Sequence, residues 1–213
     1  MEKKLKKRLL IAAALLTAFA VWTLLVSFVD VRPIGPEGSK VGLAGLNGLV
    51  HRLVGVNMAL YEITDWLGLL SIATALGFAV LGLCQLIKRK SLLRVDRSIL
   101  ALGGFYIAVF AAYVLFEFIA VNYRPVLIEG RLEASYPSST TMLTLCVMPT
   151  AAMQLASRIK GKALRFGAVI VITAFTVFMV IGRGASGVHW ISDIIGGALL
   201  SGGLVTVYRA FSE

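Results

Sequence analysis

The sequence has few charged residues, few cysteines and very few histidines. Charged side chains make up 15% of the 213 residues, whereas soluble domains are typically about 25% charged. The two cysteines, Cys84 and Cys146, each lie inside an apolar run, which excludes a disulfide framework and favours small buried hydrophobic side chains. The only histidines are His51 and His189, and no Cys-x-x-Cys occurs, so the sequence implies neither a metal nor another cofactor.

Apolar residues dominate the chain, at 58% of the sequence with a mean hydropathy of +0.87. Such a composition indicates a protein that the lipid bilayer surrounds. The net charge of +10 does not indicate nucleic acid binding, because the basic residues cluster in short segments between the apolar runs. Aromatic residues do not alternate with these basic residues, as they would on a surface that stacks bases.

Six apolar runs are long enough to be membrane helices, so we expect an all-α bundle of six transmembrane helices that forms a single domain over residues 1–213. The first run is longer than a signal-peptide core and has no small-residue cleavage site, so it is interpreted as a membrane anchor. The connection between the first two runs contains a moderately apolar stretch, Val41–Leu60, for which we expect a helix in the membrane interface. The predicted spans are Leu9–Val29, Trp66–Ile87, Ser98–Val121, Ser138–Ala156, Phe166–Ile181 and Ser192–Tyr208.

The distribution of lysine and arginine predicts the orientation of these spans. Most of the 21 basic residues lie in Lys3–Arg8, Lys88–Arg97 and Arg158–Arg165, and Arg209 lies near the C-terminus. The positive-inside rule therefore places both termini in the cytoplasm. The polar loops 122–137 and 182–192 then face the outside together, on a multi-pass protein of a cell membrane that we take to be a bacterial plasma membrane.

These two outer loops contain residues that could take part in catalysis. His189 and Asp193 are four positions apart at the start of a predicted helix, so both project from one face. A carboxylate in this position can hold one imidazole nitrogen and leave the other free for attack or proton transfer. A purely structural pair, in which the histidine has its hydrogen bonds satisfied and the aspartate starts the helix, explains the spacing equally well. Arg124 and Arg183 in the same loops favour a functional site.

Two further features of the outer loops are consistent with an anion site. Arg183 lies in what we expect to be a glycine-rich turn, and its guanidinium suits phosphate oxygens. Pro137 opens the fourth apolar run, and the hydroxyl residues after it can cap the helix while its free N–H groups bind an anion. Capping alone would also explain these hydroxyl residues, which are Ser138, Ser139, Thr140 and Thr141.

Together these residues resemble the type 2 phosphatidic acid phosphatases, a family of six-helix membrane enzymes with three sequence motifs. Arg183-x5-His189-x3-Asp193 matches the functional residues and the spacing of the third motif, Ser-Arg-x5-His-x3-Asp. Arg124-Pro125 matches the end of the first, Lys-x6-Arg-Pro, and Pro137-Ser138 matches the start of the second, Pro-Ser-Gly-His. The three occur in the family's order.

The resemblance implies a role for each matching residue. His189 would be the nucleophile that takes the phosphoryl group, and Asp193 would orient it. Arg124, Arg183, Ser138 and the backbone at Ser139 would hold the phosphate oxygens of a lipid substrate.

The chain departs from the family at the histidine of the second motif, which donates a proton to the leaving group and is Thr140 here. Either hydrolysis is lost, or the leaving group hardly needs a proton. An alkoxide needs one, since its conjugate acid ionises near the ~15.7 of water, whereas a phosphate leaving group has a relevant pKa of about 6. A lipid diphosphate such as undecaprenyl diphosphate is therefore the expected substrate.

The first motif also departs from the family, because Glu117 occupies the lysine position. We expect it to form an ion pair that positions Arg124, and a role as substitute acid is the other interpretation. Glu129 and Glu133 are expected to be ordinary loop charges, although either could replace the lost acid.

Two alternatives to hydrolysis stay open at this point. The phosphohistidine that forms when His189 takes the phosphoryl group could pass this group to another lipid instead of water. The chain could also be an inactive lipid-phosphate binder or transporter that keeps the arginine cage. The oligomeric state does not follow from the sequence.

Overall fold

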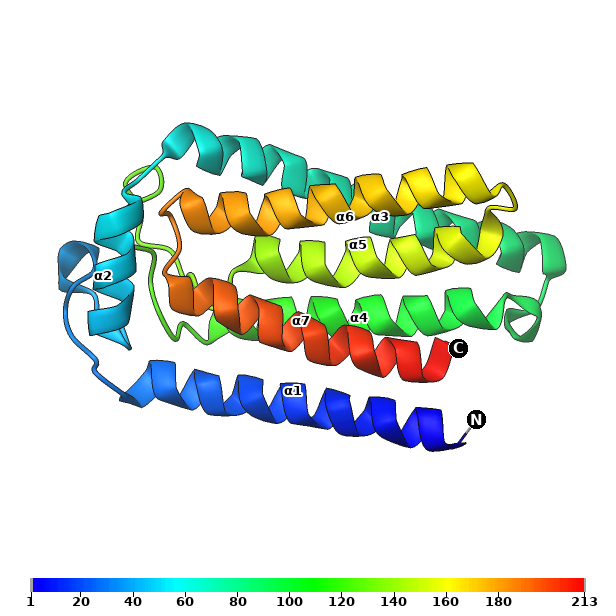
Figure 1. Ribbon diagram of the computed structural model, residues 1–213, viewed down its shortest axis with the longest axis horizontal. Helices are drawn as coiled ribbons and strands as arrows, with labels where there is room; N and C mark the ends of the chain where they lie inside the picture. Colours follow the sequence, from blue (N-terminus) through cyan, green and yellow to red (C-terminus); the bar gives the residue numbers. More distant parts are fainter. Residues whose placement is uncertain (1, 213) are drawn as a thin grey trace.

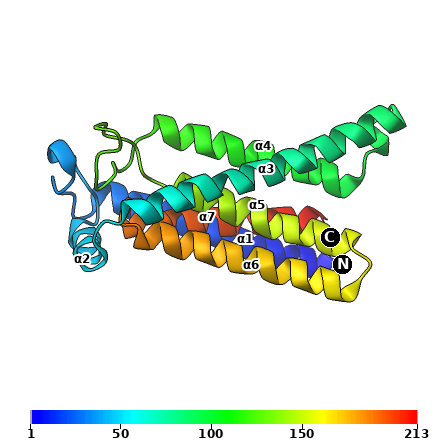
Figure 2. The same cartoon turned by 90° about the horizontal axis from the view of Figure 1, so that it is seen from above.

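A computed structural model describes residues 2–212, and within this range the fold consists of helices and connecting loops without a β-strand. The all-α prediction is therefore confirmed. All the α-helices except α2 run along the length of the molecule, and α2 lies across one end of the bundle (Figures 1 and 2). The helices are α1 (Glu2–Phe28), α2 (Ala44–Val54), α3 (Met58–Arg89), α4 (Arg97–Phe118), α5 (Ser139–Arg158), α6 (Lys162–Ala185) and α7 (Ile191–Ser212), with 3-10 turns at Pro36–Gly38 and Leu92–Arg94.

Five of these helices, α1, α3, α4, α6 and α7, are long and apolar enough to cross a membrane. The fourth predicted span corresponds to α5, which is long enough but less apolar. It contacts α3, α4, α6 and α7 and buries polar side chains such as Thr144 and Gln154. A helix that other helices shield from lipid can carry such residues. The six-span arrangement therefore stays a prediction, with α5 as the undecided span.

Several helix ends differ from the prediction. The second span begins eight residues earlier than expected, at Met58, where the side chain of Asn57 accepts a hydrogen bond from the Leu60 backbone N–H. Hydropathy identifies only the apolar part of this helix, which hydrocarbon would cover, and the first turns of α3, before Trp66, are more polar and lie outside that part. The fifth span also extends further, so that Arg183 lies in the last turn of α6 and not in a turn of its own.

The expected interfacial helix over Val41–Leu60 is shorter in the structure. It is α2, Ala44–Val54, and the residue after it is Gly55, whose positive φ of 70° breaks the helix. The remaining residues of the segment form a link and the start of α3. The α2 helix contacts the beginning of α7, at the end of the bundle where the outer loops lie (Figure 1).

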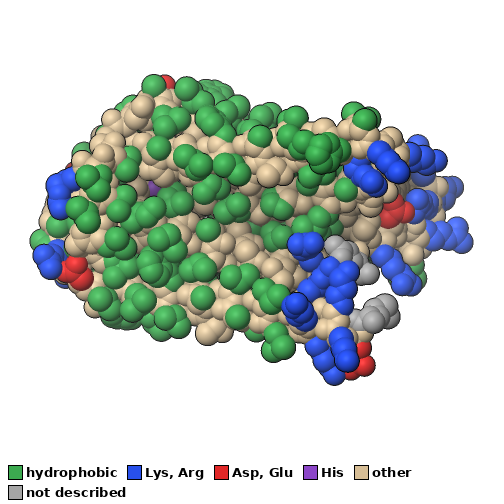
Figure 3. Space-filling model, in the orientation of Figure 1, with side chains coloured by type: hydrophobic (Ala, Val, Ile, Leu, Met, Phe, Trp, Pro, Cys, Tyr) green, Lys and Arg blue, Asp and Glu red, His purple; other side chains and the backbone are tan. Residues whose placement is uncertain are grey.

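The hydrophobic core lies between α4, α5 and α7. Buried core side chains include Phe105, Met142 and Tyr208. Cys146 is buried among them, as the sequence predicts, whereas Cys84 is exposed on the outward surface of α3, and neither forms a disulfide. On the face drawn in Figure 3, apolar side chains lie along the length of the bundle, which is the character expected of a surface in contact with lipid.

The two ends of the bundle differ in charge. Both chain termini lie at one end (Figure 1), where Arg8 Nη1 donates to the Arg209 carbonyl at 2.6 Å. Lysine and arginine side chains gather at this end (Figure 3). The α6–α7 loop and α2 lie at the opposite end, so the fold separates the basic end from the candidate site.

Candidate functional site

The loop between α6 and α7 is fixed by close packing against the link between α2 and α3. The Ser186 carbonyl accepts a hydrogen bond from the Asn57 N–H at 2.9 Å. Next to it, Gly187 has a φ of +66°, and a Cβ there would lie 1.8 Å from the carbonyl oxygen of Gly55. Only glycine satisfies both the backbone conformation and the space. This loop leads directly to His189.

Gly187→Ala is expected to destabilise the protein by about 2–4 kcal/mol, because it combines left-handed backbone strain with a clash against a main-chain oxygen. Gly130→Ala is the matched control, since Gly130 has a φ of +74° but no atom within 4 Å of the place that a Cβ would occupy. The control should lose only about 1 kcal/mol. Thermal unfolding of both variants in detergent measures the difference, and equal losses would contradict the packing argument.

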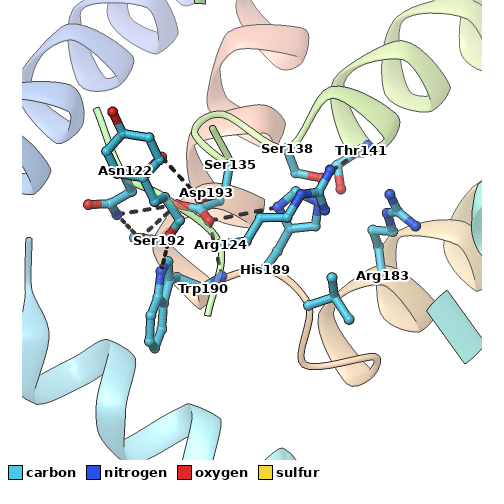
Figure 4. A network of polar contacts seen from close by, with 12 residues as sticks. Asn122, Arg124, Ser135, Ser138, Thr141, Arg183, His189, Trp190, Ser192 and Asp193 are labelled. Carbon is cyan, nitrogen blue, oxygen red and sulfur yellow. Dashed lines mark hydrogen bonds and ion pairs between the residues drawn. The ribbon is translucent and has the colours of Figure 1, made fainter. Parts of the chain in front are cut away.

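His189 is buried beside Arg124. The residue is 4% exposed, and its Nε2 lies 3.0 Å from Arg124 Nη1 (Figure 4). Burial, together with the nearby guanidinium groups, lowers the pKa of His189 to about 4, although Asp193 acts in the opposite direction. The imidazole is therefore neutral at pH 7. An arginine N–H can only donate, so Nε2 carries the lone pair and the ring proton sits on Nδ1.

Asp193 faces the other ring nitrogen. Its Oδ2 lies 3.7 Å from His189 Nδ1, which is ion-pair distance but too long for a hydrogen bond, and Nδ1 has no hydrogen-bond partner within the described chain. The carboxylate is fully buried and accepts from the Trp190 N–H at 3.0 Å and from Ser192 Oγ at 3.2 Å. These contacts fix the carboxylate beside the imidazole.

Two asparagines that the sequence did not single out as site residues complete this network. Asn122 Nδ2 lies 3.4 Å from Asp193 Oδ1, and its Oδ1 accepts from the Gly42 N–H. Asn47, on α2, donates to Ser192 Oγ at 3.0 Å and accepts from the Ser192 N–H at 3.2 Å. Both asparagines are fully buried. They tie the loop before α5 and the crossing helix α2 to the start of α7.

Arg124 is held by a different carboxylate from the one expected. Its Nε lies 2.9 Å from Glu133 Oε2, and the two residues are also joined by a backbone hydrogen bond across the loop. The predicted ion pair between Glu117 and Arg124 does not form. Glu133 is therefore more than a loop charge, because it orients the guanidinium that contacts His189.

Arg183 enters the site from α6 and is almost fully buried. Its Nη2 lies 3.0 Å from Asp65 Oδ1, and its Nη1 donates to the Tyr61 carbonyl at 3.2 Å and to Thr64 Oγ1 at 3.3 Å. These partners lie on α3, in turns that the prediction placed outside the second span. Arg183 makes no direct contact with His189, and Figure 4 shows it on the far side of the site from Asp193.

The ring of Tyr61 brings the two arginines together. The guanidinium carbons of Arg183 and Arg124 lie 4.5 Å and 5.7 Å from its centroid. Both charges therefore stack near one aromatic ring and act on the buried imidazole. The predicted convergence of Arg124, Arg183 and His189 at one end of the bundle is observed, but only Arg124 touches the histidine.

The start of α5 supplies the hydroxyl groups. Ser138 caps the helix, accepting from the Thr141 N–H at 3.5 Å, and its own N–H donates to the Asp193 carbonyl at 3.1 Å. Ser139 lines a small cleft together with His189 and Glu117. Thr140 does not line that cleft, and its methyl group packs close to Gly68 on α3.

Three buried polar atoms at the site have no hydrogen-bond partner within residues 2–212. They are Thr141 Oγ1, Arg183 Nε and His189 Nδ1. His189 Nδ1 faces Asp193, so the ligand is indicated by the other two atoms, Thr141 Oγ1 and Arg183 Nε. Buried polar groups are normally satisfied, and two that are not indicate a place for a polar ligand. With two guanidinium groups and a helix N-terminus at the same place, the ligand that fits is an anion.

Comparison with known proteins shows the family and the fold of the chain. Residues 106–213 match the PAP2 superfamily. No curated protein matches the chain. The crystal structure of a transmembrane PAP2-type phosphatidylglycerolphosphate phosphatase from Bacillus subtilis superposes with a TM-score of 0.60 over 94% of each chain, with 20% identical residues, and so shows a shared fold. The family match covers just over half of this sequence, and the chain belongs to the PAP2 superfamily.

Proposed function

We propose that this protein is a membrane lipid phosphatase that hydrolyses a lipid phosphate or diphosphate through a phosphohistidine on His189. The observation that carries this proposal is the buried imidazole whose Nε2 lies 3.0 Å from Arg124 Nη1. A neutral imidazole is a nucleophile, and a guanidinium beside it would hold the phosphoryl oxygens that it attacks. Asp193, behind the ring, would stabilise the positive charge that develops on it.

The remaining contacts to the phosphate follow from the anion site. Arg183, Ser138 and the backbone at Ser139 would bind the other oxygens, and the unsatisfied hydroxyl of Thr141 adds a donor that the motifs do not include. Donors that are already in position lower the barrier because they need no reorganisation when charge develops. In the proposed topology the site lies on the extracytoplasmic side, opposite the basic end that carries both termini.

For the substrate we propose a polyprenyl diphosphate, with undecaprenyl diphosphate as the best candidate. Thr140 replaces the family's proton donor, and it packs against Gly68 away from the cleft. Expulsion of an alkoxide then lacks an acid, whereas a phosphate leaving group departs without one.

A substrate panel tests the proposal. The purified protein should release phosphate from undecaprenyl diphosphate at least about 100-fold faster than from phosphatidic acid, since a general acid typically contributes 10²–10⁴-fold. Phosphatidylglycerol phosphate is a second monoester for comparison. Equal or faster turnover of phosphatidic acid would contradict the diphosphate assignment. If no lipid is hydrolysed but labelled lipid phosphate still binds, the protein is a binder and not a phosphatase.

A further inference from the structure

The proposed phosphohistidine must be broken by water, and this second step needs a base even when the first step needs no acid. Attack of water on phosphorus produces a proton that some group must accept. Thr140 stands at the position of the family's acid–base histidine, and a threonine hydroxyl is a poor base. The residue that accepts this proton can be identified from the structure, on the condition that the proposed function holds.

A cleft of about 20 Å³ lies against His189, which is room for about one water molecule. Glu117, at the end of α4, and Ser139, at the start of α5, contribute to its walls. The walls are therefore partly polar, which a bound water requires. Glu117 and the proposed nucleophile thus line the same water-sized space.

Glu117 has no competing partner. Across residues 2–212 neither a hydrogen bond nor an ion pair engages its side chain, and Arg124, the partner expected from the sequence, is bound to Glu133. An unpaired carboxylate near the apolar end of a transmembrane helix is rare and usually functional. Asp193, the other carboxylate near the imidazole, already accepts three hydrogen bonds and lies behind the ring.

We infer that Glu117 is the general base that activates the hydrolytic water. The carboxylate removes a proton as the water oxygen bonds to phosphorus, and the phosphorus–nitrogen bond to His189 breaks. The bonding electron pair returns to the imidazole nitrogen, the proton stays on Glu117, and inorganic phosphate leaves. The protonated carboxyl then gives its proton to the next water molecule that enters the cleft, which restores the base.

Glu117→Gln tests the inference, because glutamine keeps the size of the side chain but cannot accept the proton. With undecaprenyl diphosphate labelled in its terminal phosphate, turnover should fall about 10²–10⁴-fold while acid-labile label accumulates on the protein, toward one phosphoryl group per chain. The matched control is Glu129→Gln, in the exposed tip of the loop before α5, which should behave as the wild type.

The outcomes separate this inference from the proposed function. Turnover of Glu117→Gln within a few-fold of Glu129→Gln would overturn the inference and leave the phosphatase in place. Slow turnover without accumulated phosphoenzyme would also overturn it, since Glu117 would then act before the phosphohistidine forms. A wild-type protein that releases no phosphate would refute the proposed function itself, and the inference with it.

Discussion

Replacing His189 with alanine is expected to reduce phosphate release from undecaprenyl diphosphate by at least about 10⁴-fold and to abolish the labelled phosphoenzyme. Removing the nucleophile of a hydrolase eliminates the covalent route and leaves only the residual rate that the binding groups provide. Here those groups are Arg124, Arg183 and the start of α5, and all of them are still present in the His189→Ala variant. The measurement is phosphate release in detergent micelles, with acid-quenched labelling of the protein.

His51→Ala is the control for this experiment, because His51 is the only other histidine in the sequence. Its ring packs against Trp190 at a centroid distance of 5.3 Å, so it supports the site without facing the cleft. We expect the variant to retain turnover within about 10-fold and to form phosphoenzyme. Label on the His189→Ala protein, or turnover close to that of the wild type, would show that another residue is the nucleophile.

Asp193→Asn is expected to reduce turnover by about 10²–10⁴-fold, in line with the effect of the equivalent change in a serine-protease triad. The amide cannot stabilise the positive charge that develops on the imidazole. The amide also has only one acceptor oxygen, so it cannot accept from both the Trp190 N–H and Ser192 Oγ, which donate to different carboxylate oxygens of Asp193. Phosphate release and thermal unfolding should therefore be measured on the same samples.

The double variant His189→Ala/Asp193→Asn distinguishes a catalytic role from a structural one. If Asp193 acts through the imidazole, the double variant should be no slower than His189→Ala alone, because residues that act as a unit are not additive. Ser192→Ala is the matched control, since it removes one donor to the carboxylate but leaves its charge, and it should lose less than about 10-fold. Fully additive losses would assign Asp193 to folding.

The sequence predicted the apolar helices well because their signal is local. A segment that crosses about 30 Å of hydrocarbon must be apolar over its whole length, and five helices meet that requirement. The polar turns at Tyr61 and Asp65 escaped assignment to α3, since they extend past the apolar segment. The α5 helix is an ambiguous span for a different reason: other helices surround it, so its side chains need not be apolar.

The site was predictable only where its members are close in sequence. Arg183, His189 and Asp193 have a fixed spacing along one loop and helix, which a motif can capture. The partners of these residues cannot be found in this way: Asp65 is 118 positions from Arg183, and Asn122 is 71 positions from Asp193. The contact between Glu133 and Arg124 also depends on how the loop folds back, which no short pattern encodes.

The position of the two chain ends determines where a tag or a fused protein would lie relative to the candidate site. The α7 helix has 22 residues and so rises about 33 Å from the His189 loop to the C-terminus. An affinity tag or a fused reporter at either terminus would be attached at the basic end of the bundle and would not obstruct the cleft. Lipid head groups would be processed at one pole of the bundle, and any fused or tethered partner would be held at the other.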